Sequence, residues 1–297
     1  FKYVTLRMCA EVGVDIMFHT YFCDSIVEGR AVRGAIVENK SGRQAMMAHV
    51  VVDASGDADV CARAGAPFWQ THKDEAPRLN DSLMYRIQFG SARPEGTFAC
   101  DFGTSAVVWG PGVGPINGVD ADELSRAEVD ARLRVYEDFA RKQAEHPELA
   151  DARLAETPPL LGVRQTRFVE GEYKLTAEDA LTGRRFDDAV AISSCAIIHY
   201  YGYRRYLEHE GYDIPYRCLV PKEVDGLLAA GRCISSEQQP YESHRAMAPI
   251  MAIGQAAGTA AALCCRSAAG PRSLSVQLLQ DELESHGAVV RIGGKGL

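Results

Sequence analysis

The stretch "MAPIMAIGQAAGTAAA" (247–262) lies within 20 residues, 246–265, that carry no charged side chain. A run of this length approaches the roughly 20 residues of a membrane span. Its composition argues against a span, because Ala and Gly dominate it and Leu, Ile and Phe are scarce. A tightly packed helix in a protein core is the better interpretation. The spacing of Gly254 and Gly258 would let another backbone approach such a helix closely.

The residues before this stretch suggest a ligand at its beginning. "GLLAAGRCIS" (226–235) is typical of a buried strand that ends in a glycine turn, and "SEQQPYESHR" (236–245) then leads to the helix. The N–H groups at the start of an uncapped helix favour partial negative charge. Arg245 would add a fixed positive charge there. We therefore expect the turn from Arg245 to Met251 to contact a flat, electron-rich ligand, whereas 254–262 serves packing.

A second candidate site is "DASGDADV" (53–60), which follows the triple valine 50–52. A calcium loop starting at Asp53 or Asp57 would need Gly at its sixth position, where Ala58 or Ala62 stands. The spacing thus excludes that kind of metal site. Read as the end of a strand, the small residues 54–56 let a ligand lie against the backbone, and Asp57 is expected to cap the following helix. A plain structural turn is the alternative.

The pattern along the chain indicates one domain interrupted by another. Strand-like runs at 15–27, 31–38 and 44–53 follow a helix at 2–12, and a similar pattern of strand, glycine turn and helix returns after residue 223. Between them lie strands expected at 82–89 and 97–110, an amphipathic helix at 120–155 and a helix starting at Thr176. A last helix is expected from 273 or 275 to about 286. The predicted boundaries are 1–68 and 224–297 for the divided domain and 69–223 for the insertion.

Composition excludes several classes of protein. A net charge of −8 gives no basis for binding nucleic acid or anionic lipid. The nine cysteines form no Cys-x-x-Cys pair and no zinc-spaced set with histidine, so we predict no metal site. Scattered among apolar neighbours, they indicate reduced thiols and a cytoplasmic protein. The first residues show no basic-then-apolar signal peptide.

Four blocks of the sequence resemble successive signature blocks of the FAD-dependent oxidoreductases of the glutathione-reductase type two class. The blocks are "VVVDASGDADVCARAGAPF" (50–68), "RQTRFVEGEYKLTAEDALTGRRFDDAVA" (164–191), "IPYRCLVPKEVDGLLAAGRCIS" (214–235) and "RAMAPIMAIGQAAGTAAAL" (245–263). These proteins are distant relatives of the fumarate reductase and succinate dehydrogenase flavoproteins. The resemblance implies an α/β (α+β) fold, with a Rossmann-like three-layer FAD-binding domain interrupted by a mixed α+β substrate or cap domain, and it implies FAD as the cofactor.

The resemblance also implies which residues contact FAD. The first block would lie against the ADP half, the third would hold the ribityl chain, and the fourth would meet the pyrimidine edge of the flavin. The strand containing "HTYF" (19–22) resembles the family segment that meets adenine. The implied contacts are Phe22, Ala54, Ser55, Gly56, Asp57, Gly231, Arg232, Arg245, Ala246, Met247, Ala248 and Met251.

One family feature does not occur in this sequence. The family begins with G-x-G-x-x-G between a strand and a helix, whose N-terminus binds the pyrophosphate. "GPGVGPING" (110–118) contains glycines, but Pro115 or Asn117 stands where the third glycine is needed. We therefore expect that the N-terminal βαβ unit is missing from this chain or is supplied by a partner chain.

The predicted function is hydride transfer between a small organic substrate and flavin N5, because the flavin carries the redox chemistry. His199 and Tyr201 could move protons, and Arg204 or Arg205 could bind an anionic substrate. His244, beside Arg245 at the expected flavin site, is a further catalytic candidate, although an exposed loop histidine is an equal alternative. The alternative function is a non-catalytic or partner-dependent subunit of a flavoprotein complex. A homo-oligomer is a further expectation.

Overall fold

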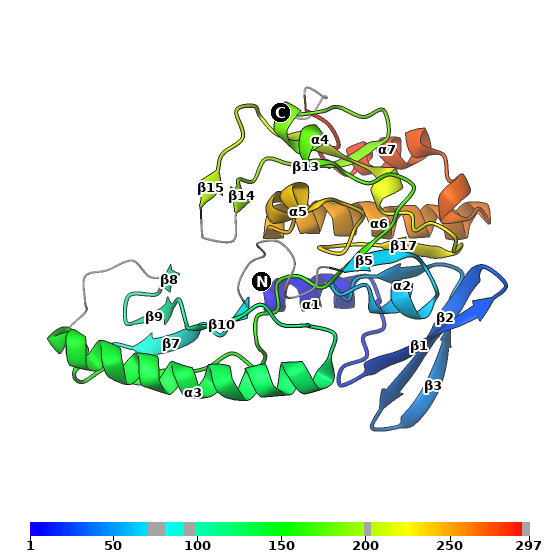
Figure 1. Cartoon of the computed structure of the whole chain (residues 1–297). Coiled ribbons are helices and arrows are strands. Elements are labelled where there is room, and N and C mark those ends of the chain that lie inside the picture. Colours follow the sequence, from blue (N-terminus) through cyan, green and yellow to red (C-terminus); the bar gives the residue numbers. More distant parts are fainter. Residues whose placement is uncertain (71–80, 92–98, 199–202, 293–297) are drawn as a thin grey trace.

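The chain folds into a mixed α/β structure, seen here in a computed structural model that describes residues 1–70, 81–91, 99–198 and 203–292. The long helix α3 (Ala121–Glu145) and a small sheet occupy one end, and helices α5, α6 and α7 occupy the other (Figure 1). Three clusters of buried apolar side chains form the cores. One cluster lies within residues 83–161, and the other two join segments from both ends of the sequence.

Two short parallel strands hold the remote parts of the chain together. β4 (Val51–Asp53) pairs with β17 (Leu227–Ala229), so that Val51 faces Leu227 and Asp53 faces Ala229. Apart from Asp53 at the end of β4, their side chains are apolar, as expected for parallel strands that are covered on both faces. β17 leads through the predicted glycine turn to the predicted helix α6 (Met247–Ser267), but the segment 236–245, expected as a loop, contains the helix α5 (Gln238–His244).

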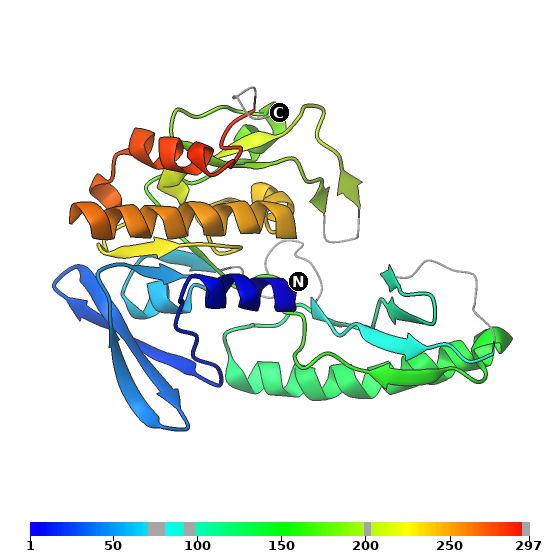
Figure 2. The same cartoon turned by 180° about the vertical axis from the view of Figure 1, so that it is seen from behind.

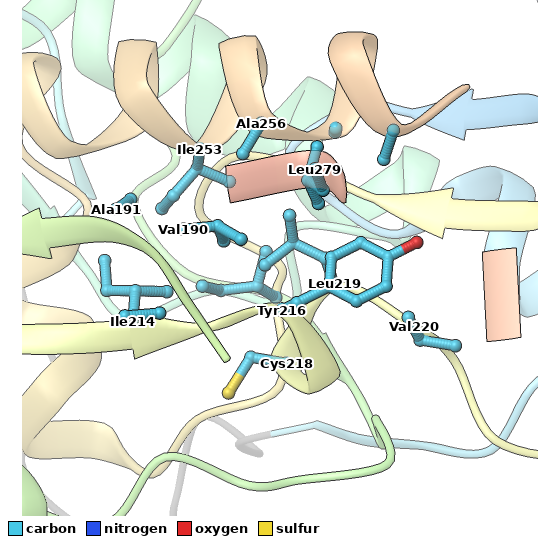
Figure 3. Close-up of a cluster of buried hydrophobic side chains, with 14 of the residues drawn as sticks. Val190, Ala191, Ile214, Tyr216, Cys218, Leu219, Val220, Ile253, Ala256 and Leu279 are labelled. Atoms are coloured by element: carbon cyan, nitrogen blue, oxygen red, sulfur yellow. The ribbon is translucent and has the colours of Figure 1, made fainter. Parts of the chain in front are cut away.

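Helix α6 packs one face against the core and leaves the other open. Ile253, Ala256, Ala257 and Ala260 are fully buried, and Figure 3 shows Ile253 and Ala256 facing Val190 of β13 (Ala189–Ser193). Within the described part of the chain, α6 is the one helix long and apolar enough to cross a membrane, but a buried core helix passes the same test.

The glycines of α6 do not serve the packing that the sequence suggested. Gly254 and Gly258 are exposed, and a Cβ atom added to either would meet nothing within 4 Å. The expectation of a close backbone contact there is therefore wrong for the part of the chain that the structure describes.

The first sixty residues form a three-stranded antiparallel meander with two helices. β1 (Tyr21–Glu28), β2 (Ala31–Asn39) and β3 (Gly42–Met47) pair in that order, with turns at the predicted glycines. The predicted strand 44–53 is in fact two strands, β3 and β4. α1 (Lys2–Glu11) has no buried residue and lies on the outside of the molecule, in the foreground of Figure 2. α2 is short (Asp59–Arg63).

The middle of the chain forms a four-stranded sheet covered by α3. The strand order is β11 (Arg153–Glu156), β7 (Tyr85–Gln88), β9 (Ser105–Val108) and β8 (Cys100–Asp101). Asp120 caps α3 by accepting a hydrogen bond from the Glu123 amide at 2.8 Å. The predicted helix 120–155 ends ten residues early, because Pro147 cannot donate to the helix and starts a 3₁₀ turn.

The remaining elements complete the end that contains α6. α4 (Ala177–Thr182) starts with the predicted capping box of Thr176 and Asp179. β13 pairs with β16 (Tyr212–Pro215), and α7 (Val276–Ser285) packs beside α6. The short strands are β5 (Phe68–Gln70), β6 (Asp81–Ser82), β10 (Gly112–Gly114), β12 (Arg167–Val169), β14 (Ile197–Ile198) and β15 (Arg204–Arg205), and the 3₁₀ turns are Pro147–Leu149, Tyr216–Cys218 and Pro271–Ser273.

Candidate functional site

The turn that follows β4 is held by the buried carboxylate of Asp53. Its Oδ1 accepts from the backbone N–H of Ser55 at 3.0 Å and from the Ser55 hydroxyl at 2.7 Å, and its Oδ2 accepts from the Cys61 amide at 2.9 Å. Ser55 Oγ in turn accepts from the Asp59 amide at 3.0 Å, at the start of α2. The expected cap at Asp57 is therefore wrong. Ser55 binds the helix start instead, which leaves the Asp57 carboxylate to other partners.

Asp57 joins the two strand ends through Arg232. Its Oδ1 accepts from Arg232 Nη2 at 2.6 Å and from the Thr166 hydroxyl at 2.6 Å. Gly56 has a φ of +82°, and a Cβ added there would lie 3.0 Å from the guanidinium carbon of Arg232. A glycine is thus needed for the guanidinium to lie against this turn. The structure brings together Gly56, Asp57 and Arg232, three of the residues for which the resemblance implied contact with FAD.

Gly231 and Arg232 also provide open space and an unsatisfied donor. Gly231 has a φ of +92°, and a Cβ added to it would meet no atom within 4 Å. The Nε of Arg232 is buried without a hydrogen-bond partner. Buried donors normally have a partner, so this atom is positioned for a ligand that accepts hydrogen bonds.

Arg245 stands where α5 ends and α6 begins. Burial lowers the pKa of its guanidinium, and the positive charges of Arg164 and Arg232 add to this effect. Its Nε is also buried without a hydrogen-bond partner, and the guanidinium lies 5.9 Å from the ring centroid of Tyr241. Three arginines in one buried region favour an anionic or electron-rich ligand there.

The start of α6 also favours negative charge on a ligand. Its N-cap residue, Ala246, offers no side-chain cap, and the first turn contains no acidic residue. The first N–H groups of the helix therefore lack a partner from a cap and favour negative charge. Met247 and Met251 are 70% and 50% exposed on this turn, and Ala248 is exposed as well. These apolar side chains are accessible to a flat ligand.

His244 is not the exposed loop histidine that was the alternative to a catalytic role. It belongs to α5, is fully buried, and its Nε2 lies 3.0 Å from the Ser236 hydroxyl. Burial lowers the pKa of His244 from 6.5 to about 3. The imidazole is therefore neutral at physiological pH, which suits a positioning role better than proton donation. Its catalytic role stays a prediction.

The segment 164–168 belongs to the second family block, but sequence reasoning assigned no site residue in it. Gln165 and Gln238 exchange side-chain amide hydrogen bonds of 2.6 and 2.9 Å, and Thr166 bonds to Asp57. The hydroxyl of Tyr241 donates to the backbone oxygen of Arg164. The polar run "RQTR" directly before β12 was the available signal, because a soluble strand rarely begins with four polar residues unless they have partners.

A cavity of about 730 Å³ adjoins the pair of Asp57 and Arg232. This volume lies within the range of small-molecule sites, about 300 to 1,000 Å³. Its wall combines four charged residues with Leu124 of α3 and the apolar residues of the loop that follows β11. The lining residues are Asp57, Gly118, Leu124, Ser125, Glu128, Arg132, Pro159, Leu160, Leu161, Gly162, Val163 and Arg232.

The other predicted residues lie elsewhere or outside the described residues. Phe22 is partly buried in β1 and packs against the cluster that contains Val32 and Ala58. Ala54 is exposed in the turn after β4. Arg204 is exposed on β15 and makes no ion pair within the described ranges. His199 and Tyr201 fall in 199–202, which the structure does not describe.

The fold and the site together define a mixed α/β protein whose candidate ligand site lies at the carboxyl ends of two parallel strands. Residues 1–100 and 84–283 match the family described as FAD dependent oxidoreductase, and the chain belongs to this family. FAD is therefore its cofactor.

Comparisons with curated proteins and with solved structures add little to this assignment. No curated protein matches the sequence. Among solved structures, the chain is similar to the myxobacterial chondrochloren halogenase CndH, described as a variant of FAD-dependent halogenases, with 15% identity and a TM-score of 0.42. The match covers 95% of this chain and 54% of the halogenase, so the chain spans about half the length of that protein.

The residues present fit FAD. The two buried Nε atoms of Arg232 and Arg245 lack partners, and the space beside Gly231 would be filled by any side chain. The uncapped start of α6 completes a set of donors without acceptors. A cofactor with a chain of hydroxyls, phosphates and an electron-rich ring supplies acceptors for all of them.

Proposed function

We propose that the chain is an oxidoreductase that transfers a hydride between a small organic substrate and FAD. The observation that carries this proposal is the buried, unpaired guanidinium edge of Arg245 at the uncapped start of α6. Negative charge that develops on a reduced flavin ring is stabilised by a fixed cation and by helix N–H groups.

Each part of the site has a separate task in this proposal. Bound FAD supplies the atom that accepts or donates the hydride. Arg232, held by Asp57, and the open backbone at Gly231 would hold the ribityl part of FAD, between its ring and its phosphates. Arg245 and the first turn of α6 would hold the ring. His244 would keep the Arg245 end of α5 in place through Ser236, and Arg204 would bind an anionic substrate.

Other finer features also remain proposals. We propose a Rossmann-like three-layer domain with the middle segment 69–223 as a cap, supported by the pairing of β4 with β17 beneath α6. His199 and Tyr201 are proposed to move protons. A cytoplasmic location is supported by nine cysteines that form no disulfide. The match to an oxidoreductase family does not favour the alternative of a non-catalytic subunit.

Two uncovered faces bear on the partners of this chain. α1 buries no residue, and the small residues Gly254 and Gly258 of α6 contact nothing. We propose that a nucleotide-binding βαβ unit covers these faces in the working enzyme, whichever polypeptide carries it. The acidic net charge supports a small-molecule substrate and no nucleic acid.

Titration with FAD tests the proposed site. We expect the Arg245→Gln variant to bind FAD at least about tenfold more weakly, since a buried charged hydrogen bond contributes about 1.5–3 kcal/mol. Arg266→Gln is the matched control, because Arg266 lies on α6 as well but is 68% exposed and paired with Glu282. Equal FAD affinity of Arg245→Gln and the unchanged chain would show that Arg245 does not contact FAD.

A further inference from the structure

The cavity of about 730 Å³ beside Asp57 and Arg232 has charged groups in its wall that are paired within the chain. Arg232 donates to Asp57 Oδ1 at 2.6 Å. Arg132 pairs with Glu128 and also donates to the Thr157 hydroxyl at 2.7 Å. The described wall therefore contains two positive and two negative groups that neutralise each other, and it offers no net charge to a ligand.

The loop that follows β11 uses its backbone N–H groups inside the chain. The amides of the consecutive wall residues 161–163 donate, in order, to Glu128 Oε2 at 2.6 Å, to the Ser82 carbonyl at 3.0 Å and to the Leu161 carbonyl at 3.0 Å. Pro159, a further wall residue, has no N–H group. These four positions therefore offer no amide donor to a phosphate or a carboxylate.

The beginning of α3, which also borders the cavity, does not favour an anion either. Asp120 caps this helix, and Asp122 and Glu123 lie in its first turn. These acidic side chains already occupy the positive end of the helix dipole. Ser125 lines the cavity, but its hydroxyl donates to the Ala121 carbonyl at 2.6 Å. The polar groups on this side are thus satisfied by the helix itself.

Among the described residues, the rest of the wall is apolar. Leu124 and Val163 are partly buried and pack against the core that contains Leu161. Leu160 extends this surface outward and is 74% exposed. The wall is also tightly fitted, because a Cβ added to Gly118 would lie 2.5 Å from Val163 Cγ1. A preformed, mostly apolar cavity of this size is typical of a site for a small organic molecule.

We propose that this cavity binds a neutral, largely apolar organic molecule. Its chemistry differs from that of the contacts proposed for FAD, where unpaired arginine donors and helix N–H groups call for acceptors. The pair of Asp57 and Arg232 belongs to both sites, so the molecule would lie next to the cofactor. This last placement rests on the proposed function, whereas the chemistry of the cavity does not depend on it.

Isothermal titration calorimetry with two compounds of the same shape tests the class of ligand. At pH 7 the phenolic 2-naphthol is neutral and 2-naphthoate is an anion. We expect 2-naphthol to bind the full chain with a dissociation constant on the order of 100 µM, as for a ligand of this size. The anion should bind at least about tenfold more weakly, because the wall offers it no unpaired cation. Equal or tighter binding of 2-naphthoate would overturn the neutral class.

A substitution that fills the cavity tests the location. Ser125→Trp places a large side chain at an exposed position of the wall and should weaken 2-naphthol at least about tenfold. Ala140→Trp is the matched control, because Ala140 is also small and exposed on α3 but lies about 22 Å further along the helix. Circular dichroism checks that both variants fold. No binding of 2-naphthol to the unchanged chain, or equal binding to both variants, would overturn the site.

Titrations with FAD separate this inference from the proposed function. A chain that binds 2-naphthol in the cavity but no FAD would contradict the proposed function and support the cavity site. With FAD bound, a shift of the flavin absorption band on addition of 2-naphthol would show that the ligand contacts the ring, as a substrate does. An unshifted band would show a ligand that binds in the cavity apart from the ring.

Discussion

Replacement of Gly56 by Ala separates backbone strain from the contact that holds Arg232. At a φ of +82° an L residue costs about 1–2 kcal/mol. Gly65 has the same φ, but a Cβ added there meets nothing within 4 Å. Gly65→Ala should therefore lower the free energy of unfolding by about 1–2 kcal/mol and leave ligand binding unchanged.

Gly56→Ala should cost more than its control. The added Cβ would lie 3.0 Å from the guanidinium carbon and 3.1 Å from Nη1 of Arg232, so the guanidinium must shift by a few tenths of an ångström, and we expect this shift to break its contact with Asp57. Loss of this partly exposed, 2.6 Å ion pair adds about 1 kcal/mol to the strain. We expect the affinity for FAD to fall about tenfold, in line with 1.4 kcal/mol.

Urea denaturation and a titration of flavin fluorescence measure the two quantities for both variants. Equal FAD affinities and equal unfolding free energies in Gly56→Ala and Gly65→Ala would refute the reasoning. That result would mean that Arg232 is not held by the turn after β4.

Two further predictions concern the free energy of unfolding. Because the pKa of buried His244 is lowered from 6.5 to about 3, the unfolded chain binds a proton that the folded chain does not bind between these values. The free energy of unfolding should therefore fall as the pH decreases below 6.5, and this group should contribute about 1.4 kcal/mol per pH unit. Urea denaturation at pH 7 and pH 5 should show that His244→Gln loses less unfolding free energy than the unchanged chain. An equal loss in the two proteins would contradict the prediction. Gly258→Ala should raise the free energy of unfolding by about 0.5–1 kcal/mol, since Gly258 is exposed inside a helix. If thermal or urea denaturation instead shows a lower free energy of unfolding, another segment packs closely on this face.

The sequence was sufficient for elements whose signals are local. The glycine turn after β17, the core helix α6 and the capping box at Thr176 follow from residues within a few positions of each other. The length of α3 was overestimated because charged residues continue the amphipathic pattern beyond Pro147, where the helix has already ended.

The contacts that build the site could not be predicted from local patterns. Asp57 was expected to cap α2, yet Ser55 competes for the same amide groups and Asp57 binds Thr166 and Arg232, more than 100 residues away. The neutrality of His244 depends on complete burial, which only the packed structure determines. The open glycine face of α6 depends in the same way on which segments are near it.

The parallel pairing of β4 with β17 has a consequence for how the enzyme is made. Val51 pairs with Leu227, so the two halves of the site come from opposite ends of the chain. Pairings so distant in sequence form slowly, because the intervening loop must be closed first. A growing chain therefore cannot complete this site before β17 and α6 have been synthesised. We expect FAD to bind after that point and not to the earlier segments alone.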